Sequence, residues 1–451
     1  MAHGWIGLAQ AATPADLVAA RTQMALSLGW HIVLACFGVA MPAFTVYAEW
    51  RGHRGDAAAG TLAHRWARAM GVLFAVGAVS GTILSFEMGL LWPGLMGTYG
   101  QVIGLPFTLE GTAFFLEAIF LGIYLYAWDR LPPRAHLLTG IPIVVAGVAS
   151  AFFVVSANAW MNQPRGFDLD AGTVTRVDPW RAMFNPATPP QTVHMIVAAF
   201  MVAGFGLASV YAVAMLRGRR DRYHRLGFAV PFTVAALAAP VQVFTGDWVA
   251  RFLATNQPVK LAAIEGLPHS TAGASLSIGG VFVDGELRYA IRIPDALSLL
   301  AFWNPDATVL GLDTAPPDAR PPVTPVHLSF QLMVAIGLGL VALALWYAYL
   351  RWRRRDPGRW FLRAAAVAGI AAGIALEAGW VTTEVGRQPW IAYGRMRVAD
   401  AVNPERGLTA GLVAVVAVYT VLTVATVAVL RHLARAPRAD IAPQEADRDP
   451  G

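Results

Sequence analysis

Nine apolar stretches are the feature that most constrains what this chain can fold into. A helix needs about 20 mostly apolar residues to cross the ~30 Å hydrocarbon core of a bilayer. Of the 451 residues, 56% are hydrophobic and 14% are charged, against about 25% charged in soluble domains. The pattern predicts an all-α integral membrane protein. Its spans are expected at 22–47, 68–91, 105–128, 136–159, 191–216, 226–248, 326–350, 361–384 and 407–430.

Charge and cysteine content exclude several other classes. The formal net charge is +6, but the basic residues lie in short tracts between the spans, where membrane topology explains them. We therefore expect no nucleic-acid partner. The single cysteine, Cys36, lies in an apolar run, which excludes a disulfide framework and a thiolate metal cluster. The first residues lack the pattern of a cleaved signal peptide, so none is expected.

Arginine clusters predict the orientation. They occur between spans 1 and 2, 3 and 4, 5 and 6, and 7 and 8, and in the tail, whereas Trp92–Gly104 carries no basic residue. The positive-inside rule then places the N-terminus outside and the C-terminus in the cytoplasm. The last outer loop opposes this placement with Arg387, Arg395, Arg397 and Arg406, but four loops and the tail outweigh it.

The spans and this orientation divide the chain into four parts. We expect helices 1–6 in residues 1–248, an extracytoplasmic loop in 249–325, helices 7–9 in 326–434 and a cytoplasmic tail in 435–451. The long loop contains many Gly and Pro residues and a short alternating stretch, Tyr289–Ile293. These features predict a small folded loop rather than a linker.

Ionisable side chains inside the spans are functional candidates, because each costs about 2.5–3.5 kcal/mol at a helix centre. Orientation places most of them in the outer half of the membrane, together with Met333, and only Glu117 near the middle. The candidates are His31, Glu87, Glu110, Glu117, His194, Asp247, Glu377 and Glu384.

Each candidate also has an ordinary structural interpretation. A lone buried His is more often a hydrogen-bonding core residue than a ligand, and a lone Met usually packs. Glu110 and Glu117 are seven residues apart, which puts them on one helix face; a proton relay and a cation site are both compatible with that spacing. Glu377 and Glu384 repeat it, and Trp380 lies between them. His327 is expected to be a surface residue rather than a ligand.

Taken together, His, His, Met and Glu from four helices at one depth favour heme. A His and Met pair makes a six-coordinate electron-transferring heme, whereas a single ligand leaves a position free for oxygen. No Cys-x-x-Cys-His motif is present, so any heme is held noncovalently. A second observation concerns Lys260, the only lysine among 34 basic residues. Arginine does not replace lysine freely where a compact ammonium is required, so this position is a functional candidate.

Five segments, ordered along nearly the whole chain, resemble subunit I of cytochrome bd-type quinol oxidases. The last of the five is highly specific. The segments are Arg21–Met24 with Trp30–His31, Leu109–Glu117, Trp160–Pro164, Lys260–Glu265 and Glu377–Trp390.

The resemblance implies a quinol:oxygen oxidoreductase that reduces oxygen to water, with three hemes in this subunit. His194 and Met333 match the axial pair of the low-spin heme b. His31 and Glu384 match the iron ligands of the two oxygen-site hemes, a high-spin heme b and a heme d (or a third heme b). Which of the two residues holds which heme stays open.

The same resemblance implies roles for six other residues. Trp380 matches a tryptophan between hemes, and Arg387 a heme-propionate partner. Glu110 and Glu117 match acids beside the oxygen site, the second on a proton route from the cytoplasm. Lys260 and Glu265 match quinol-binding residues at the start of the outer loop called the Q loop. Protons would be taken up inside and released outside, so a gradient forms without pumping.

Two departures from the family pattern stand out. Gln331 occupies a position where many members have Arg near the low-spin heme, and the loop lacks an insertion near 308–320, as in the short-loop, cyanide-insensitive branch. The expected partners are quinol, oxygen, membrane lipid and subunit II, with a small accessory subunit possible, in a bacterial inner membrane. The alternatives are a heme-free proton- or cation-coupled secondary transporter and a heme-free assembly partner. The chain lacks the internal repeat and paired broken spans typical of transporters.

Overall fold

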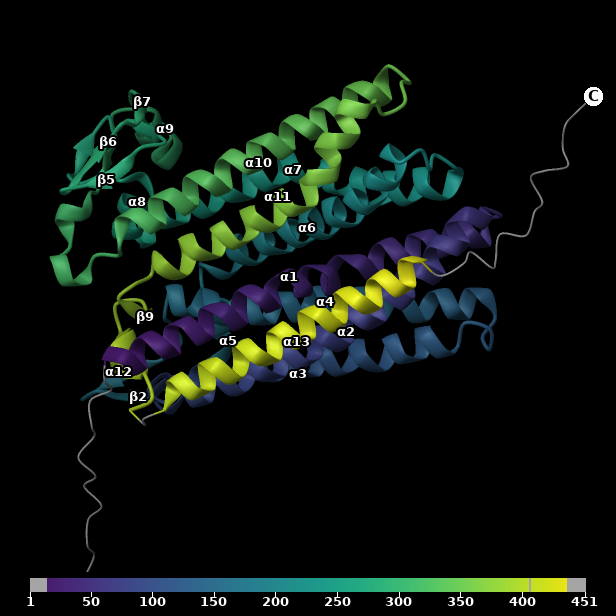
Figure 1. Cartoon of the computed structure of the whole chain (residues 1–451). Coiled ribbons are helices and arrows are strands. Elements are labelled where there is room, and N and C mark those ends of the chain that lie inside the picture. Colours follow the sequence, from purple (N-terminus) through teal and green to yellow (C-terminus); the bar gives the residue numbers. More distant parts are fainter. Residues whose placement is uncertain (1–13, 405–406, 436–451) are drawn as a thin grey trace, which may run out of the picture.

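The structure, a computed structural model, describes residues 14–404 and 407–435 (Figure 1). The expectation about a signal peptide, Arg406 and nearly all of the expected tail 435–451 lie outside the described residues.

Within those residues, nine helices are long and apolar enough to cross a membrane, which confirms the predicted fold class. They are α1 (Pro14–His53), α2 (Ala57–Leu91), α3 (Pro93–Tyr126), α4 (Pro133–Asn162), α6 (Thr188–Leu216), α7 (Arg222–Asn256), α10 (Val323–Trp352), α11 (Arg359–Val385) and α13 (Leu408–Arg435). Most extend beyond the predicted spans, because helical hydrogen bonding continues past the apolar core until a cap or proline ends it. Thus α7 continues past 248 to Asn256, and Asp247, expected to end the sixth span, lies inside it.

Side-chain caps and prolines set where several helices begin. The Asp56 carboxylate accepts a hydrogen bond from the backbone N–H of Ala59 at the start of α2. Asp221 does the same for His224 at the start of α7, at 3.0 Å. Pro93 and Pro133 are the first residues of α3 and α4, where the missing N–H costs no helical hydrogen bond.

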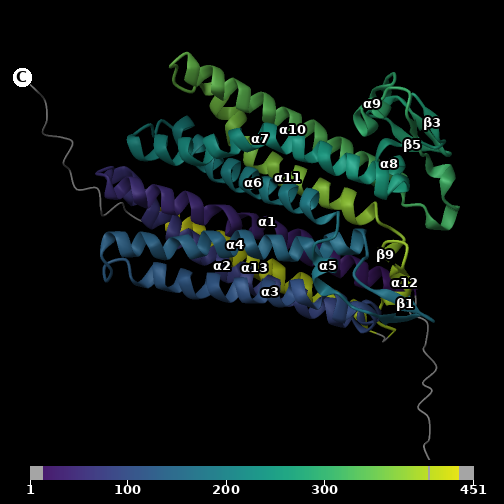
Figure 2. The same ribbon diagram turned by 180° about the vertical axis from the view of Figure 1, so that it is seen from behind.

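The helices form two groups that α6 joins. One group contains α6, α7, α10 and α11, and the other contains α1–α4 and α13, as both views show (Figures 1 and 2). Helix α6 packs against α7 and α11 in its own group and against α1 and α4 in the other. Phe205, Phe228, Phe232 and Phe361 fill the centre of the first group and are all buried.

Close contact between α6 and α11 requires glycine. A Cβ added to Gly369 would lie 2.7 Å from both the Gly206 Cα and the Ser209 Oγ. The Ser209 hydroxyl donates to the Ala365 carbonyl at 3.0 Å and accepts from the Gly369 N–H at 2.9 Å. Small residues of this kind let membrane helices approach and hydrogen-bond directly.

Gly369→Ala is therefore expected to destabilise the protein by about 1–3 kcal/mol, the usual cost of overpacking a close contact. The measurement is the thermal unfolding midpoint of the purified protein in detergent. Gly373→Ala on the same helix is the matched control, because a Cβ there meets nothing within 4 Å. Equal midpoints for the two variants would contradict the prediction.

The longer connections lie together at one end of the bundle, where α1 begins (Figure 1). Between α4 and α6 lie β1 (Asp168–Asp170), β2 (Thr173–Thr175) and α5 (Pro179–Met183); between α11 and α13 lie β9 (Trp390–Ala392), β10 (Met396–Arg397) and α12 (Val398–Ala401). Helix α13 ends at the opposite end.

The segment between α7 and α10 is folded. It contains α8 (Pro258–Glu265), β3 (Thr271–Ala272), β4 (Leu276–Ile278), β5 (Val281–Val283), β6 (Glu286–Arg288), β7 (Ile291–Ile293), α9 (Ala296–Phe302), β8 (Thr308–Val309), η1 (Leu312–Thr314) and η2 (Pro317–Ala319). The strands form nested antiparallel pairs: β5 with β6, β4 with β7 and β3 with β8. A buried apolar cluster that includes Leu261, Ile264 and Leu297 packs this segment onto the ends of α7 and α10.

Candidate functional site

His194 and Met333 lie in the group formed by α6, α7, α10 and α11. The His194 ring lies against α7, where its Nδ1 is 3.1 Å from the Thr245 hydroxyl and its Nε2 is 3.1 Å from the Gln242 amide nitrogen. Met333, on α10, faces α11, and its sulfur would lie 2.9 Å from a Cβ on Gly379. An imidazole and a thioether are therefore presented inside one helix group.

His31 is held between α1 and α2. Its Nδ1 is 2.7 Å from the Ser80 hydroxyl, which itself donates to the Gly77 carbonyl at 2.9 Å. That contact orients the ring and leaves Nε2 as the atom available for a metal, the usual arrangement of a ligating histidine.

Glu384, at the end of α11, lies in a polar network. Its Oε1 accepts from the Asn158 amide at 2.6 Å, and its Oε2 accepts from the Arg387 guanidinium at 2.5 Å. Each carboxylate oxygen has a second lone pair, so these bonds are compatible with iron ligation. The buried Arg387 keeps two nitrogens, Nε and Nη1, without a partner among the described residues, which suits a carboxylate ligand such as a propionate.

The structure brings Lys260 to this same network. The buried ammonium donates to the Thr383 carbonyl at 2.9 Å and to the Asn162 Oδ1 at 3.2 Å. Burial, and next the nearby Arg387 charge, lower the pKa of Lys260 to about 7, although the Glu384 charge opposes the shift. Sequence reasoning assigned Lys260 and Glu384 to different functions, and only the fold reveals that they are neighbours.

A cavity of about 190 Å³ adjoins Lys260. Its lining comes from α8, from the turns before α10 and from the segment after α11: Val259, Lys260, Ala315, Ala319, Pro321, Gly386, Gln388, Trp390, Tyr393 and Gly394. An apolar cavity of about 150 Å³ holds a benzene ring, so this one has room for a single substituted ring.

Glu265 lies apart from that cavity. Five residues along a helix turn through about 140° beyond a full circle, so Lys260 and Glu265 occupy different faces of α8. Glu265 is 5% exposed as a residue, and its Oε2 has no hydrogen-bond partner among the described residues. Burial raises the pKa of Glu265 to about 8.

The expectation that His327 is a surface residue is wrong. His327 is fully buried, with Nδ1 2.8 Å from the Ile264 carbonyl and Nε2 3.0 Å from the Gly279 carbonyl. The folded loop covers the start of α10, and the His327 ring links α10 to that loop through these two contacts. Gln331 has a similar role: its amide donates to the Ser277 carbonyl at 2.9 Å and its oxygen accepts from the Gly279 N–H at 3.1 Å.

Glu110 and Glu117 both face α4. The Glu110 carboxylate accepts from the Ser150 hydroxyl at 3.2 Å. The buried Glu117 carboxyl lies 3.6 Å from where a Cβ on Gly147 of α4 would be and 4.0 Å from one on Gly38 of α1. The interface of α1, α3 and α4 therefore contains two carboxyl groups and little side-chain volume.

A further polar cluster in that interface escaped sequence reasoning. The buried Glu49 carboxylate accepts from the Tyr124 hydroxyl at 2.6 Å and lies 2.7 Å from the His136 Nδ1. The partly exposed His53 is 3.6 Å from it. Glu49 and His136 fall at the ends of their predicted spans, where charged residues are ordinary, so only their burial marks them. Tyr124 follows Glu117 by seven residues on α3, on the same helix face.

The residues present fit heme in three respects. The donors are imidazole, thioether and carboxylate groups. Three of them face glycines: an added Cβ on Gly81 would lie 3.2 Å from the His31 ring, one on Gly246 3.4 Å from His194, and one on Gly379 2.9 Å from Met333. Buried polar atoms without partners among the described residues, on Arg387, Gln242 and Glu377, adjoin the same helices. Trp380, between Glu377 and Glu384, packs against the main core.

Comparison with known proteins identifies relatives along the whole fold. The family model for cytochrome bd terminal oxidase subunit I matches residues 19–437. A putative cytochrome bd menaquinol oxidase subunit I of Bacillus subtilis is 37% identical over 86% of this chain and 89% of its own length. A cytochrome bd-II ubiquinol oxidase subunit 1 of Escherichia coli is 29% identical over 72% of this chain and 77% of its own length. The bd oxidase structure from Geobacillus thermodenitrificans superposes with a TM-score of 0.88 at 40% identity, covering 93% of this chain and 98% of the other.

Proposed function

Because this chain belongs to the family of cytochrome bd terminal oxidase subunit I, and is thus the heme-bearing subunit of a quinol oxidase in a bacterial inner membrane, we propose a role for each site residue. His194 and Met333 hold a low-spin heme b. His31 and Glu384 hold the two oxygen-site hemes, a high-spin heme b and a heme d or third heme b. When bound, the hemes supply the one-electron steps from quinol to oxygen. Family membership gives no support to the transporter alternative.

The observation that carries this assignment is that three of the four ligand candidates face a glycine. At these positions the imidazole or thioether itself occupies the space that a Cβ would fill, so glycine lets each donor side chain lie close against the neighbouring helix. Arg387 supplies two buried, unpartnered N–H groups for a carboxylate of the same group. Trp380 lies between Glu377 and Glu384 along α11.

The test is a reduced-minus-oxidised visible spectrum of the purified protein together with its partner, with extraction and identification of the hemes. Two heme b per subunit with a chlorin-type band supports the assignment with heme d. Heme b alone, at three per subunit, supports the all-b form. Protein that is folded, assembled and free of heme would refute the proposal.

We place the quinol ring in the 190 Å³ cavity beside Lys260, where the ammonium can donate to a ring oxygen. Glu265 lies on the other face of α8, outside the cavity lining, so in this proposal it receives a quinol proton indirectly and not from the ring itself. The ring needs a hydrogen-bond donor and an acceptor for its protons, and these two side chains are buried on the loop side of the membrane helices. Subunit II acts with subunit I in this family, and a small accessory subunit remains part of the proposal only.

The proposed orientation puts the start of α1 and the quinol site outside and the Glu49 cluster at the cytoplasmic end. Protons then enter through Glu49, His136 and Tyr124 and reach Glu117 and Glu110, which lie farther along the same interface of α1, α3 and α4. Quinol protons leave on the opposite side. The reaction therefore charges the membrane without a pump.

Glu117→Gln is expected to lower quinol-driven oxygen uptake by about 100-fold, within the usual range for loss of a proton-transferring group, because an amide cannot pass a proton on. The heme spectrum should not change. Glu49→Gln should slow uptake in the same assay, since it removes the carboxylate that His136 and Tyr124 face.

Glu87→Gln is the matched control for these variants. Glu87 is also a buried membrane carboxyl, but it bonds to Gln23 and Ser27 between α1 and α2, away from α4. Unchanged uptake in Glu117→Gln, or an equal loss in Glu87→Gln, would contradict the route.

A further inference from the structure

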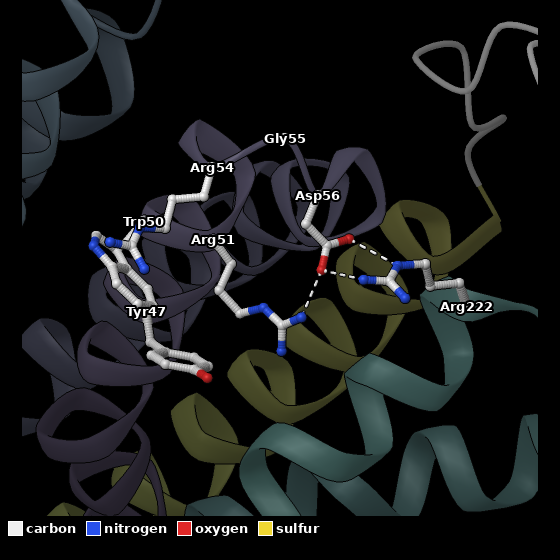
Figure 3. A pocket seen from close by; sticks show the side chains of 7 residues that line it. All are labelled: Tyr47, Trp50, Arg51, Arg54, Gly55, Asp56 and Arg222. Atoms are coloured by element: carbon white, nitrogen blue, oxygen red, sulfur yellow. Dashed lines mark hydrogen bonds and ion pairs between the residues drawn. The ribbon is translucent and has the colours of Figure 1, made fainter.

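A charged pocket lies at the end of the bundle opposite the folded loop, where α1 ends and α2 and α7 begin. It has a volume of about 430 Å³, within the ~300–1,000 Å³ range of small-molecule sites. Figure 3 labels the residues that line it: Tyr47, Trp50, Arg51, Arg54, Gly55, Asp56 and Arg222.

Positive charge exceeds negative charge in this pocket. Three guanidinium groups meet one carboxylate, so the formal balance is +2. Asp56 holds two of them: Arg51 donates to its Oδ2 at 2.8 Å, and Arg222 donates to both oxygens, at 2.8 and 3.0 Å (Figure 3). These arginines lower the pKa of Asp56 although burial opposes the shift, so its charge persists. With three guanidinium groups against this one carboxylate, the pocket keeps a net positive charge that suits an anion.

Arg54 is the cation that Asp56 does not neutralise. Its guanidinium lies over the Trp50 ring, 4.4 Å from the centroid, and it makes no ion pair with any described residue. A cation–π contact orients the group without cancelling its charge. Arg54 can therefore bind an anion without first breaking an ion pair.

The aromatic wall indicates where such an anion comes from. Tyr47 and Trp50 are 43% and 39% exposed and lie 5.8 Å apart by ring centroids. Tyr47, Trp50 and Arg51 occupy one face of the last turns of α1, and Arg54 follows directly after the helix ends at His53. The aromatic residues come first, and the guanidinium groups lie nearer the helix end. Exposed Tyr and Trp mark the membrane–water interface, and basic pockets at the ends of membrane helices bind anionic lipid headgroups.

We propose that this pocket binds the phosphodiester of an anionic phospholipid. Arg54 and the outer nitrogens of Arg51 bind the phosphate oxygens, and Tyr47 and Trp50 lie against the glycerol and the first acyl carbons. In the proposed orientation, this lipid belongs to the cytoplasmic leaflet. The site lies at the end of the bundle opposite the quinol loop. Its arginines flank Glu49 of the proposed proton entry but are not part of that route, so failure of lipid binding would not refute the proposed function.

The experiment uses the purified two-subunit complex, depleted of lipid in a neutral detergent. Phosphatidylglycerol, phosphatidylcholine or inorganic phosphate is added back at matched concentrations. Native mass spectrometry counts retained lipid, and the thermal midpoint reports stabilisation. We expect Arg54→Gln, and more strongly Arg51→Gln with Arg54→Gln, to need at least ten-fold more phosphatidylglycerol for the same stabilisation. An unchanged heme spectrum shows that the variants are folded.

Arg351→Gln with Arg355→Gln is the matched control, because it removes the same charge from exposed positions at the same end of the bundle, outside the pocket. This control should respond as the unmodified protein does. Three results would overturn the proposal. They are equal phosphatidylglycerol retention in the pocket variants, equal protection by phosphatidylcholine, and equal protection by inorganic phosphate, which would indicate a site for soluble anions.

Discussion

Replacing Glu384 with alanine is expected to remove one high-spin heme from the complex, while the low-spin heme held by His194 and Met333 stays. The carboxylate is the proposed iron ligand, and alanine offers no donor atom in its place. His194 and Met333 lie on α6 and α10, away from the Asn158 and Arg387 contacts of Glu384. We expect one heme fewer per subunit by extraction, and loss of most oxygen uptake, since the oxygen site is incomplete.

The control separates ligation from hydrogen bonding. Asn158→Ala removes the donor to Glu384 Oε1 but leaves the carboxylate and Arg387 in place. Heme content should therefore be full in Asn158→Ala and reduced in Glu384→Ala. Full heme content in both would show that Glu384 is not a ligand.

Replacing Lys260 or Glu265 with alanine is expected to abolish quinol-driven oxygen uptake and to spare oxidation of protein that has been reduced chemically. Both side chains are buried on α8, outside the membrane-spanning segments. Glu265 is outside the Glu384 network, so Glu265→Ala should keep the proposed hemes; Lys260 lies beside Glu384, so heme extraction accompanies the Lys260→Ala measurement. For Glu265→Ala the loss should reach about 100-fold or more, the scale for removing a proton acceptor. Stopped-flow oxidation of dithionite-reduced protein measures the spared step.

The same site predicts how turnover depends on pH. Burial raises the pKa of Glu265 to about 8, so its carboxyl is protonated below that pH and cannot accept a quinol proton. Turnover at low quinol concentration should therefore rise between about pH 7 and pH 9 as Glu265 ionises. In Glu265→Gln this rise should disappear.

Glu286→Ala provides the control for both measurements, because Glu286 lies exposed on β6 in the same folded segment. It should leave turnover and its pH dependence unchanged. If Lys260→Ala and Glu265→Ala turn over quinol normally, the proposed quinol site is wrong.

The sequence predicted the membrane fold well because the hydropathy of a span is summed over many residues. Each of the nine spans contains enough apolar residues to dominate its environment, whatever its neighbours are. Helix ends were less well predicted: α7 reaches Asn256 rather than 248, because capping and continued hydrogen bonding set the end and hydropathy does not report them.

Side-chain surroundings were not predictable in the same way. His327 was expected at the surface, but the folded loop buries it between the Ile264 and Gly279 carbonyls. Glu49 and His136 lie far apart in the sequence, at span ends, and become a buried pair only when α1 and α4 pack. Neither result follows from a local pattern.

The sequence by itself determined a membrane protein of the cytochrome bd oxidase subunit I family, with nine apolar helices in the part of the chain that the structure describes, since apolar length and short motifs are local properties of the chain. Only the tertiary structure decided which polar groups meet. It put Lys260 beside Glu384 and Arg387, separated Lys260 from Glu265, and closed the arginine pocket around Asp56. The physical reason is that hydrogen bonds and ion pairs act over a few ångströms, and those distances arise only when helices far apart in the sequence pack together.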